Sequence, residues 1–152
     1  MKKLLHLITQ TSGSVTPVIL RLILALAFFP HGAQKVLGWF GGYGFEGTMG
    51  FFTGAMHLPY VVALLPILTE FLGPIALFFG FFTRIAALAT GVNMLVAVLL
   101  VHLNNGFFMN WTGKQAGEGF EYHLLAMGIA AALVVAGAGA LSVDRAIANR
   151  TS

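Results

Sequence analysis

The sequence predicts an all-helical integral membrane protein, and its composition and hydrophobic pattern support that prediction. Of the 152 residues, 58% are hydrophobic and only 9% are charged, and the mean hydropathy is +0.88. A soluble domain carries roughly 25% charged residues, and one of this size could not bury so many apolar side chains. The apolar residues form continuous runs without alternation, which favours membrane-spanning helices over strands. This composition excludes a disordered chain, a nucleic-acid-binding module and an ordinary cytosolic enzyme.

Four apolar runs are long enough to cross a hydrocarbon layer of about 30 Å, which needs roughly 20 helical residues. They comprise residues 17–37, 60–82, 85–103 and 122–141. We therefore expect an integral-membrane four-helix bundle over residues 17–141. Residues 1–16 would form a short cytoplasmic or interfacial segment, and residues 142–152 a cytoplasmic tail. Thr83 and Arg84 alone would join the second and third helices in a tight hairpin.

The distribution of Lys and Arg predicts the orientation of the bundle. One side would hold Lys2, Lys3, Arg84, Arg145 and Arg150, and the other only Lys35 and Lys114. Because positive residues favour the cytoplasmic side, both termini and the hairpin should lie in the cytoplasm. The two long connections, residues 38–59 and 104–121, are rich in glycine and aromatic residues. We expect them on the outer side, as interfacial or re-entrant caps over the bundle.

Ionisable side chains within the predicted helices are the candidates for function, because a membrane tolerates them only when they are paired or hydrated. His31 and Lys35 are four residues apart, so they share one face of the first helix. Glu70 lies near the middle of the second run, and Pro74 removes the backbone hydrogen bond to the Glu70 carbonyl. The depths of Glu70 and His31 are similar, so we expect the two to meet directly or through water.

Two further residues complete the predicted site. His102 lies near the outer end of the third helix, at the level of His31. Glu121 aligns with a stripe of small residues on the fourth helix and should face the bundle, whereas His123 should meet the interface or a loop. We thus predict a ligand site in the outer half of the bundle, formed by His31, Lys35, Glu70, His102 and Glu121.

Asn93 and Arg21 also lie within the predicted helices. Asn93 is nine residues before His102, which places the two on opposite faces unless the helix bends; we expect Asn93 to form an interhelical hydrogen bond. Arg21 either belongs to the polar face of the first helix or extends to the cytoplasmic headgroups.

The cysteine and histidine content limits the cofactors. The chain has no cysteine, which excludes disulfides, iron–sulfur clusters and thiolate metal sites. The histidines lack the close spacing of metal ligands, so a metal or haem would have to be assembled from separate helices. We predict no metal site.

Four short segments, in a distinctive order, carry a family resemblance. They are Arg21 with FPHGAQKVLG at 29–38, TEFLGP at 69–74 with GFFTR at 80–84, HLNNGFF at 102–108, and GFEY at 119–122. Together they resemble the DoxX family of small bacterial membrane proteins, over about residues 17–145. The resemblance implies a multi-pass protein of the bacterial inner membrane and a role in an oxidoreductase system. Family members include the membrane subunit of a thiosulfate:quinone oxidoreductase and a partner of redox-defence enzymes. The five predicted site residues match family-typical positions.

The leading hypothesis is a component of a membrane oxidoreductase system that binds a quinone or a similar amphipathic ligand. Glu70 with His31 would supply protons, and Lys35 would stabilise a developing anion. The electrons would come from haem, flavin or a partner subunit, and among cofactors a quinone is favoured over haem or a metal. The alternatives are a non-catalytic membrane anchor for a soluble redox enzyme, and a small-solute or proton carrier gated by Glu70. Expected partners are the lipid bilayer, a soluble or membrane redox protein and a second copy of the chain, but not nucleic acid.

Overall fold

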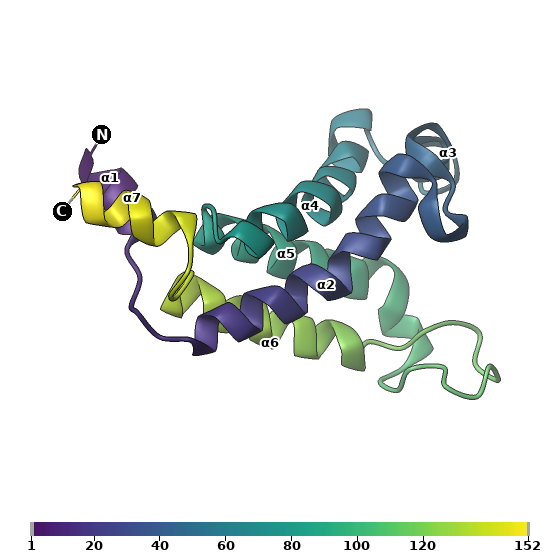
Figure 1. The fold of residues 1–152 in the computed structure, drawn as a ribbon. Coiled ribbons are helices and arrows are strands. Elements are labelled where there is room, and N and C mark those ends of the chain that lie inside the picture. Colours follow the sequence, from purple (N-terminus) through teal and green to yellow (C-terminus); the bar gives the residue numbers. More distant parts are fainter. Residues whose placement is uncertain (1, 152) are drawn as a thin grey trace.

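The computed structural model describes residues 2–151, and all the regular structure in that range is helical (Figure 1). The α-helices are α1 (Lys2–Thr9), α2 (Thr16–Leu37), α3 (Gly44–Gly50), α4 (Tyr60–Phe79), α5 (Thr83–Ala97), α6 (Glu121–Ala136) and α7 (Val143–Thr151). Short 3₁₀ segments, η1 (Trp39–Gly41) and η4 (Leu103–Asn105), and π-helical segments, η2 (Phe51–Ala55) and η3 (Val98–His102), extend or connect them. Residues 1 and 152 of the predicted terminal segments lie outside the described range. The all-helical prediction is confirmed.

Three helices are long and apolar enough to cross a membrane: α2, α4 and the helix over Thr83–Asn105 that α5 forms with η3 and η4. They correspond to the first three predicted spans. The fourth run forms α6, which has 16 residues and is about 24 Å long at 1.5 Å per residue. It was predicted to reach residue 141 but ends at Ala136, because Gly137 and Gly139 adopt positive φ angles of 75° and 76°.

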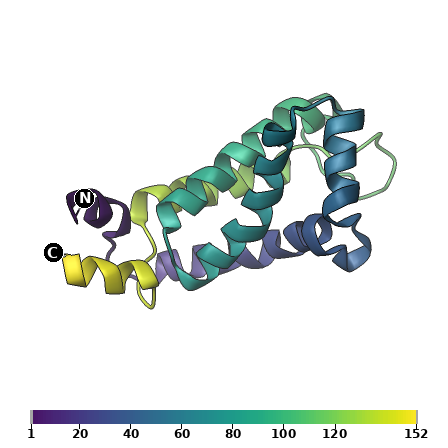
Figure 2. The ribbon, with the colours of Figure 1, turned by 90° about the horizontal axis from the view of Figure 1, so that it is seen from above.

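The helices α2, α4, α5 and α6 pack around one core, in which α2 and α5 each contact both α4 and α6 (Figures 1 and 2). The buried side chains include Leu24, Phe28, Leu77, Met94 and Leu133, which come from all four helices. Large apolar side chains also cover the outside, and Leu26, Val61 and Leu125 are 67%, 71% and 70% exposed. An apolar outer surface of this kind suits contact with lipid.

The turn between α4 and α5 is formed by residues 80–82. The hairpin was predicted at Thr83 and Arg84, but these residues begin α5 instead. Gly80 ends α4 in the left-handed conformation, with φ 64°. The Asp144 carboxylate accepts hydrogen bonds from the backbone N–H groups of Phe82 (2.7 Å) and Thr83 (2.8 Å). These are unsatisfied donors at the start of α5, so a residue 61 positions beyond Thr83 in the sequence caps this helix.

The two ends of the molecule differ in structure (Figure 1). At the terminal end, α1 packs against α7 beside the turn at residues 80–82. The opposite end, which we call the loop end, holds the connections 38–59 and 106–120. The first connection is largely helical, and its α3 packs against α2 and α4. The second is mostly irregular. The two long connections therefore lie at the same end of the helices, as predicted.

Candidate functional site

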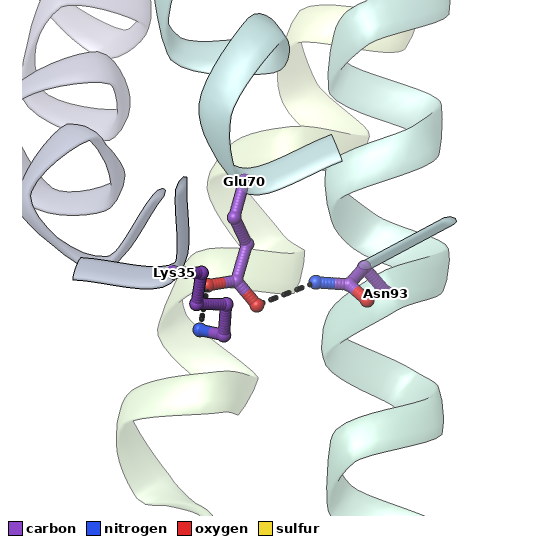
Figure 3. Close-up of polar contacts among 3 residues, drawn as sticks. All are labelled: Lys35, Glu70 and Asn93. Carbon is purple, nitrogen blue, oxygen red and sulfur yellow. Dashed lines mark hydrogen bonds and ion pairs between the residues drawn. The ribbon is translucent and has the colours of Figure 1, made fainter. Parts of the chain in front are cut away.

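An ion pair between Lys35 and Glu70 joins α2 to α4 (Figure 3). The Nζ atom of Lys35 contacts Oε2 of Glu70. Glu70 lies in the middle of α4 and is 7% exposed, whereas the Lys35 side chain is 25% exposed. A carboxylate at this position in a spanning helix needs a cation or hydrogen-bond donors, and Lys35 is the cation.

Asn93 of α5 completes this group from a third helix. Its Nδ2 donates to Oε1 of Glu70 at 3.0 Å (Figure 3). Both carboxylate oxygens therefore have partners, and each comes from a different helix. The prediction of an interhelical hydrogen bond for Asn93 is confirmed, although its partner was not foreseen. We call Lys35, Glu70 and Asn93 the polar cluster.

No direct hydrogen bond joins His31 to Glu70 within residues 2–151. Among the described residues, the hydrogen bonds of the Glu70 carboxylate go to Lys35 and Asn93. Lys35 lies one turn further along α2 than His31, and its longer side chain reaches the carboxylate first. His31 is exposed.

The rings of His102 and His123 lie against each other, with centroids 4.0 Å apart. His102 ends the π-helical segment η3. A π-helix turns less per residue than an α-helix, so η3 changes the face that His102 presents relative to Asn93. The prediction that these two residues lie on opposite faces assumed a regular α-helix. The segment η3 departs from that geometry. We call His102 and His123 the histidine pair.

His123 was expected at the interface or in a loop, and that prediction is wrong, because His123 is only 7% exposed. It lies in phase with Ala126, Ala130 and Leu133, which are also buried. This i, i+3, i+7, i+10 stripe was the signal in the sequence that would have identified the inner face of α6. The prediction instead took the small-residue stripe that begins at Glu121 as the inner face. That prediction is wrong, because Leu125, Gly128 and Ala132 on this stripe are exposed.

Tyr122 and Glu121 also lie at the start of α6. The Tyr122 ring stacks on Phe28, and its hydroxyl is buried without a hydrogen-bond partner. Glu121 is half-buried, and its backbone N–H donates to the Phe107 carbonyl at 2.9 Å. The structure does not bond the Glu121 side chain to the polar cluster. Of the five predicted site residues, Lys35 and Glu70 therefore contact each other directly. His102 lies beside His123, and neither His31 nor Glu121 bonds to the polar cluster.

Within residues 2–151, no group of three or more His, Asp or Glu side chains is arranged to hold a metal ion. The groups available to a ligand are instead a carboxylate, an ammonium group, an amide and imidazoles. Such groups exchange protons and stabilise charge.

The comparison with protein families decides the identity. The DoxX family model matches residues 16–103, more than half of the chain. The chain belongs to the DoxX family. The matched DoxX region begins at α2 and ends in η4, so it contains the whole polar cluster and His102, but not α6.

This DoxX chain is also similar to two curated proteins. It is 32% identical over 122 residues to "Putative oxidoreductase CatD" of Bacillus subtilis, covering 80% of this chain and 81% of that protein. It is 31% identical over 128 residues to "Inner membrane protein YqjF" of Escherichia coli, covering 84% and 88%. No solved structure matches the chain significantly. Family, relatives and apolar helices together place this DoxX protein in the bacterial inner membrane as a multi-pass protein in contact with lipid.

Arg21 of this DoxX protein is 2% exposed and does not extend to the headgroups, so that interpretation is wrong. Its guanidinium donates to the carbonyls of Leu77 (2.9 Å) and Phe78 at the end of α4. It also donates to Ala138 (3.2 Å) and Leu141 (2.8 Å), between α6 and α7. The Leu77 carbonyl also accepts from the Gly80 N–H at 3.1 Å. Arg21 thus bonds the end of α4 to the segment between α6 and α7 and holds the terminal end together.

An apolar groove of about 350 Å³ lies between α2 and α4 of the DoxX protein. It is lined by Ala25, Leu26, Phe29, Pro30, Pro74, Ile75, Phe78 and Phe79. Pro74 is one turn from Glu70, and Pro30 precedes His31. Because Pro30 has no N–H, the carbonyl of Leu26 lacks its helical donor. The groove thus offers an apolar surface next to the polar residues along both helices.

Proposed function

We propose that this DoxX protein binds a quinone or a similar amphipathic molecule at the polar cluster, as a component of a membrane oxidoreductase system. The observation that carries the proposal is the burial of Glu70 at mid-helix with its carboxylate shared between Lys35 and Asn93. Conversion of a quinone to a quinol takes up two electrons and two protons. It therefore needs a proton-exchanging group and a cation for anionic ring oxygen, beside an apolar surface.

In this proposal, His31, Lys35, Glu70, His102 and Glu121 are the ligand-binding residues of the outer half of the bundle. Glu70 exchanges a proton with the ligand, and Lys35 stabilises its anionic form. The groove between α2 and α4 would receive an apolar tail. The relative from Bacillus subtilis is named an oxidoreductase, which supports a redox role here, with electrons supplied by a partner protein.

The proposed topology has α6 as a fourth spanning helix and the loop end on the outer side. Arg84, Arg145 and Arg150 lie at the terminal end of the structure, and the positive-inside rule assigns that end to the cytoplasm. Residues 17–141 would then be the membrane domain, with the segments 1–16 and 142–152 at the cytoplasmic surface.

A binding titration tests the proposal. The protein contains two tryptophans, Trp39 and Trp111, both in the loop-end connections, so quenching of their fluorescence reports ligand near that end. We expect saturable quenching by decylubiquinone or a short-chain menaquinone in lipid nanodiscs. Glu70→Gln should weaken binding by about ten-fold or more, since it removes the charged partner of Lys35. Glu46→Gln, at an exposed acidic residue of α3, is the matched control and should bind as the wild type does. Non-saturable quenching, or equal affinity in the Glu70 variant, would contradict the proposal.

The same buried carboxylate also favours one alternative, a proton or small-solute carrier gated by Glu70. Such a carrier would give flux in proteoliposomes that Glu70→Gln abolishes, without quinone binding.

A non-catalytic anchor for a soluble redox enzyme would instead keep its function in the Glu70 variant and lose it when the loops are changed.

A further inference from the structure

The short helix α1 exposes leucines at the end of the molecule where the spanning helices meet the membrane surface. The helices α2 and α5 begin and α4 ends at this terminal end, beside α1 and α7 (Figures 1 and 2). Leu4 and Leu7 of α1 are 64% and 58% exposed, whereas Thr9 is 1% exposed. The two leucines are three residues apart, so they share one face of the helix. An exposed apolar face at this level suits the acyl chains just below the headgroups.

The opposite face of α1 is fixed to the rest of the protein. The helix packs against α7 and α5. Just beyond its end, Nη2 of Arg84 donates to the Gln10 carbonyl at 3.2 Å, and the Thr11 hydroxyl accepts from the Gly139 N–H at 2.7 Å. These bonds hold the leucine face pointing away from the bundle.

Unpaired cations surround this apolar face. Lys3 of α1 and Arg145 and Arg150 of α7 are exposed, and within residues 2–151 their side chains form no ion pair. The acidic side chain of the terminal end is that of Asp144, which is 1% exposed and caps α5. The other acidic residues lie in α4 or at the loop end: Glu46, Glu70, Glu118 and Glu121. The exposed surface of the terminal end is therefore strongly positive.

Hydrogen-bond donors lie beside one of these cations. The guanidinium of Arg145 lies over Gly13, where its Nη2 would be 3.1 Å from an added Cβ atom. The flanking Ser12 and Ser14 are exposed. Their hydroxyls accept from the backbone N–H groups of Ser14 (3.3 Å) and Thr16 (3.2 Å), which leaves each O–H as a donor. A guanidinium next to hydroxyl donors suits the oxygens of a phosphate group.

We propose that the terminal end is a docking surface for anionic phospholipids. Leu4 and Leu7 insert among acyl chains, and Lys3, Arg145 and Arg150 bind headgroup phosphates. Charge complementarity favours a negative partner, and the leucines beside the ends of spanning helices favour a lipid over an acidic soluble protein. This inference goes beyond the proposed function, because it concerns the other end of the molecule and uses no quinone.

Lipid titration followed by native mass spectrometry tests the charge requirement. The full chain in detergent should bind phosphatidylglycerol more tightly than phosphatidylcholine with the same acyl chains. Replacing Lys3, Arg145 and Arg150 together by Gln should weaken phosphatidylglycerol binding by roughly 100-fold, at about five-fold for each charge. Exchanging them for Arg, Lys and Lys keeps the charge and should retain the preference. Lys114→Gln, at an exposed lysine of the loop end, is the control.

A spin label at position 7 tests whether α1 lies in the membrane. The chain has no cysteine, so Leu7→Cys gives a single labelling site. In nanodiscs with phosphatidylglycerol, this label should collide more often with oxygen than with a water-soluble nickel complex, and a label at Lys114→Cys should show the reverse. Equal affinity for the two lipids, or an unchanged affinity in the Gln variant, would overturn the proposal. A label at position 7 that the nickel complex reaches freely would also overturn it, and would leave the surface to an acidic soluble protein.

Discussion

Gly32 of α2 lies directly against the backbone carbonyl of Glu70 on α4. A Cβ atom at Gly32 would overlap the carbonyl oxygen and would stand 2.7 Å from Cα of Phe71. Pro74 cannot donate to this carbonyl, so the Cα–H of Gly32 faces an acceptor that lacks its helical partner. This contact sets how closely α2 and α4 approach. It therefore fixes the position of Lys35, three residues beyond Gly32, relative to the Glu70 carboxylate.

Gly32→Ala should lower the stability of the protein by about 1–3 kcal/mol, because the new methyl group forces the two backbones apart. Thermal unfolding in detergent micelles would measure the loss, and quinone titration should show weaker binding in the same variant. Gly128→Ala is the control, since a Cβ at Gly128 of α6 would meet no atom within 4 Å. Equal melting temperatures for the Gly32 variant and the wild type would contradict the close contact.

Lys35 and Glu70 should show strong energetic coupling in a double-mutant cycle. Lys35→Met leaves the Glu70 carboxylate without its cation, which we expect to cost about 2–3 kcal/mol. This is less than the ~3–5 kcal/mol for a fully buried pair, because part of Lys35 is exposed. Adding Glu70→Gln to Lys35→Met should recover part of the loss. Additive effects of the two substitutions in denaturation experiments would show that the ion pair does not form.

Arg21→Lys should destabilise the terminal end although it keeps the positive charge. The guanidinium reaches four carbonyls from three nitrogens, and a single ammonium group cannot reproduce this geometry. Each buried carbonyl left without a donor costs about 1–3 kcal/mol, so the melting temperature should fall clearly. Arg150→Lys on the exposed side of α7 should change it little. A lysine variant as stable as the wild type would refute this role of Arg21.

The carboxyl of Asp144 should make stability depend on pH. Burial raises the pKa of Asp144 above its ordinary value of 3.8, and this outweighs the hydrogen bonds from Thr83 and Phe82 and the charge of Arg21, which lower it. The folded state then binds a proton more tightly than the unfolded state. The free energy of unfolding should therefore fall as the pH rises from about 4 through the folded-state pKa, and stay constant above it.

Asp144→Asn isolates this contribution, because an amide does not titrate in that range. The difference in unfolding free energy between wild type and variant, followed by thermal denaturation, should shrink as the pH rises. A difference that grows with pH would mean that the hydrogen bonds to the carboxylate dominate over its burial.

The apolar runs of the sequence determined the helical class, the membrane location and the three long spans, because hydrophobicity over about 20 residues is a local property. The sequence also indicated that Glu70 needs a partner, since a carboxylate in a spanning helix is otherwise too costly. It included Lys35 in the same predicted site but expected His31 to be the partner of Glu70, and it identified Asn93 as a residue that bonds another helix.

Only the tertiary structure decided which side chains meet. Lys35 rather than His31 contacts Glu70, because the Gly32 contact sets the approach of α2. The π-helical segment η3 turns His102 toward His123, and a uniformly apolar run gives no sign of such a change in helical phase. Arg21 is buried because carbonyls from two distant parts of the chain converge on it. Partner choice depends on the angle, depth and phase between helices, and these follow from packing the whole chain at once.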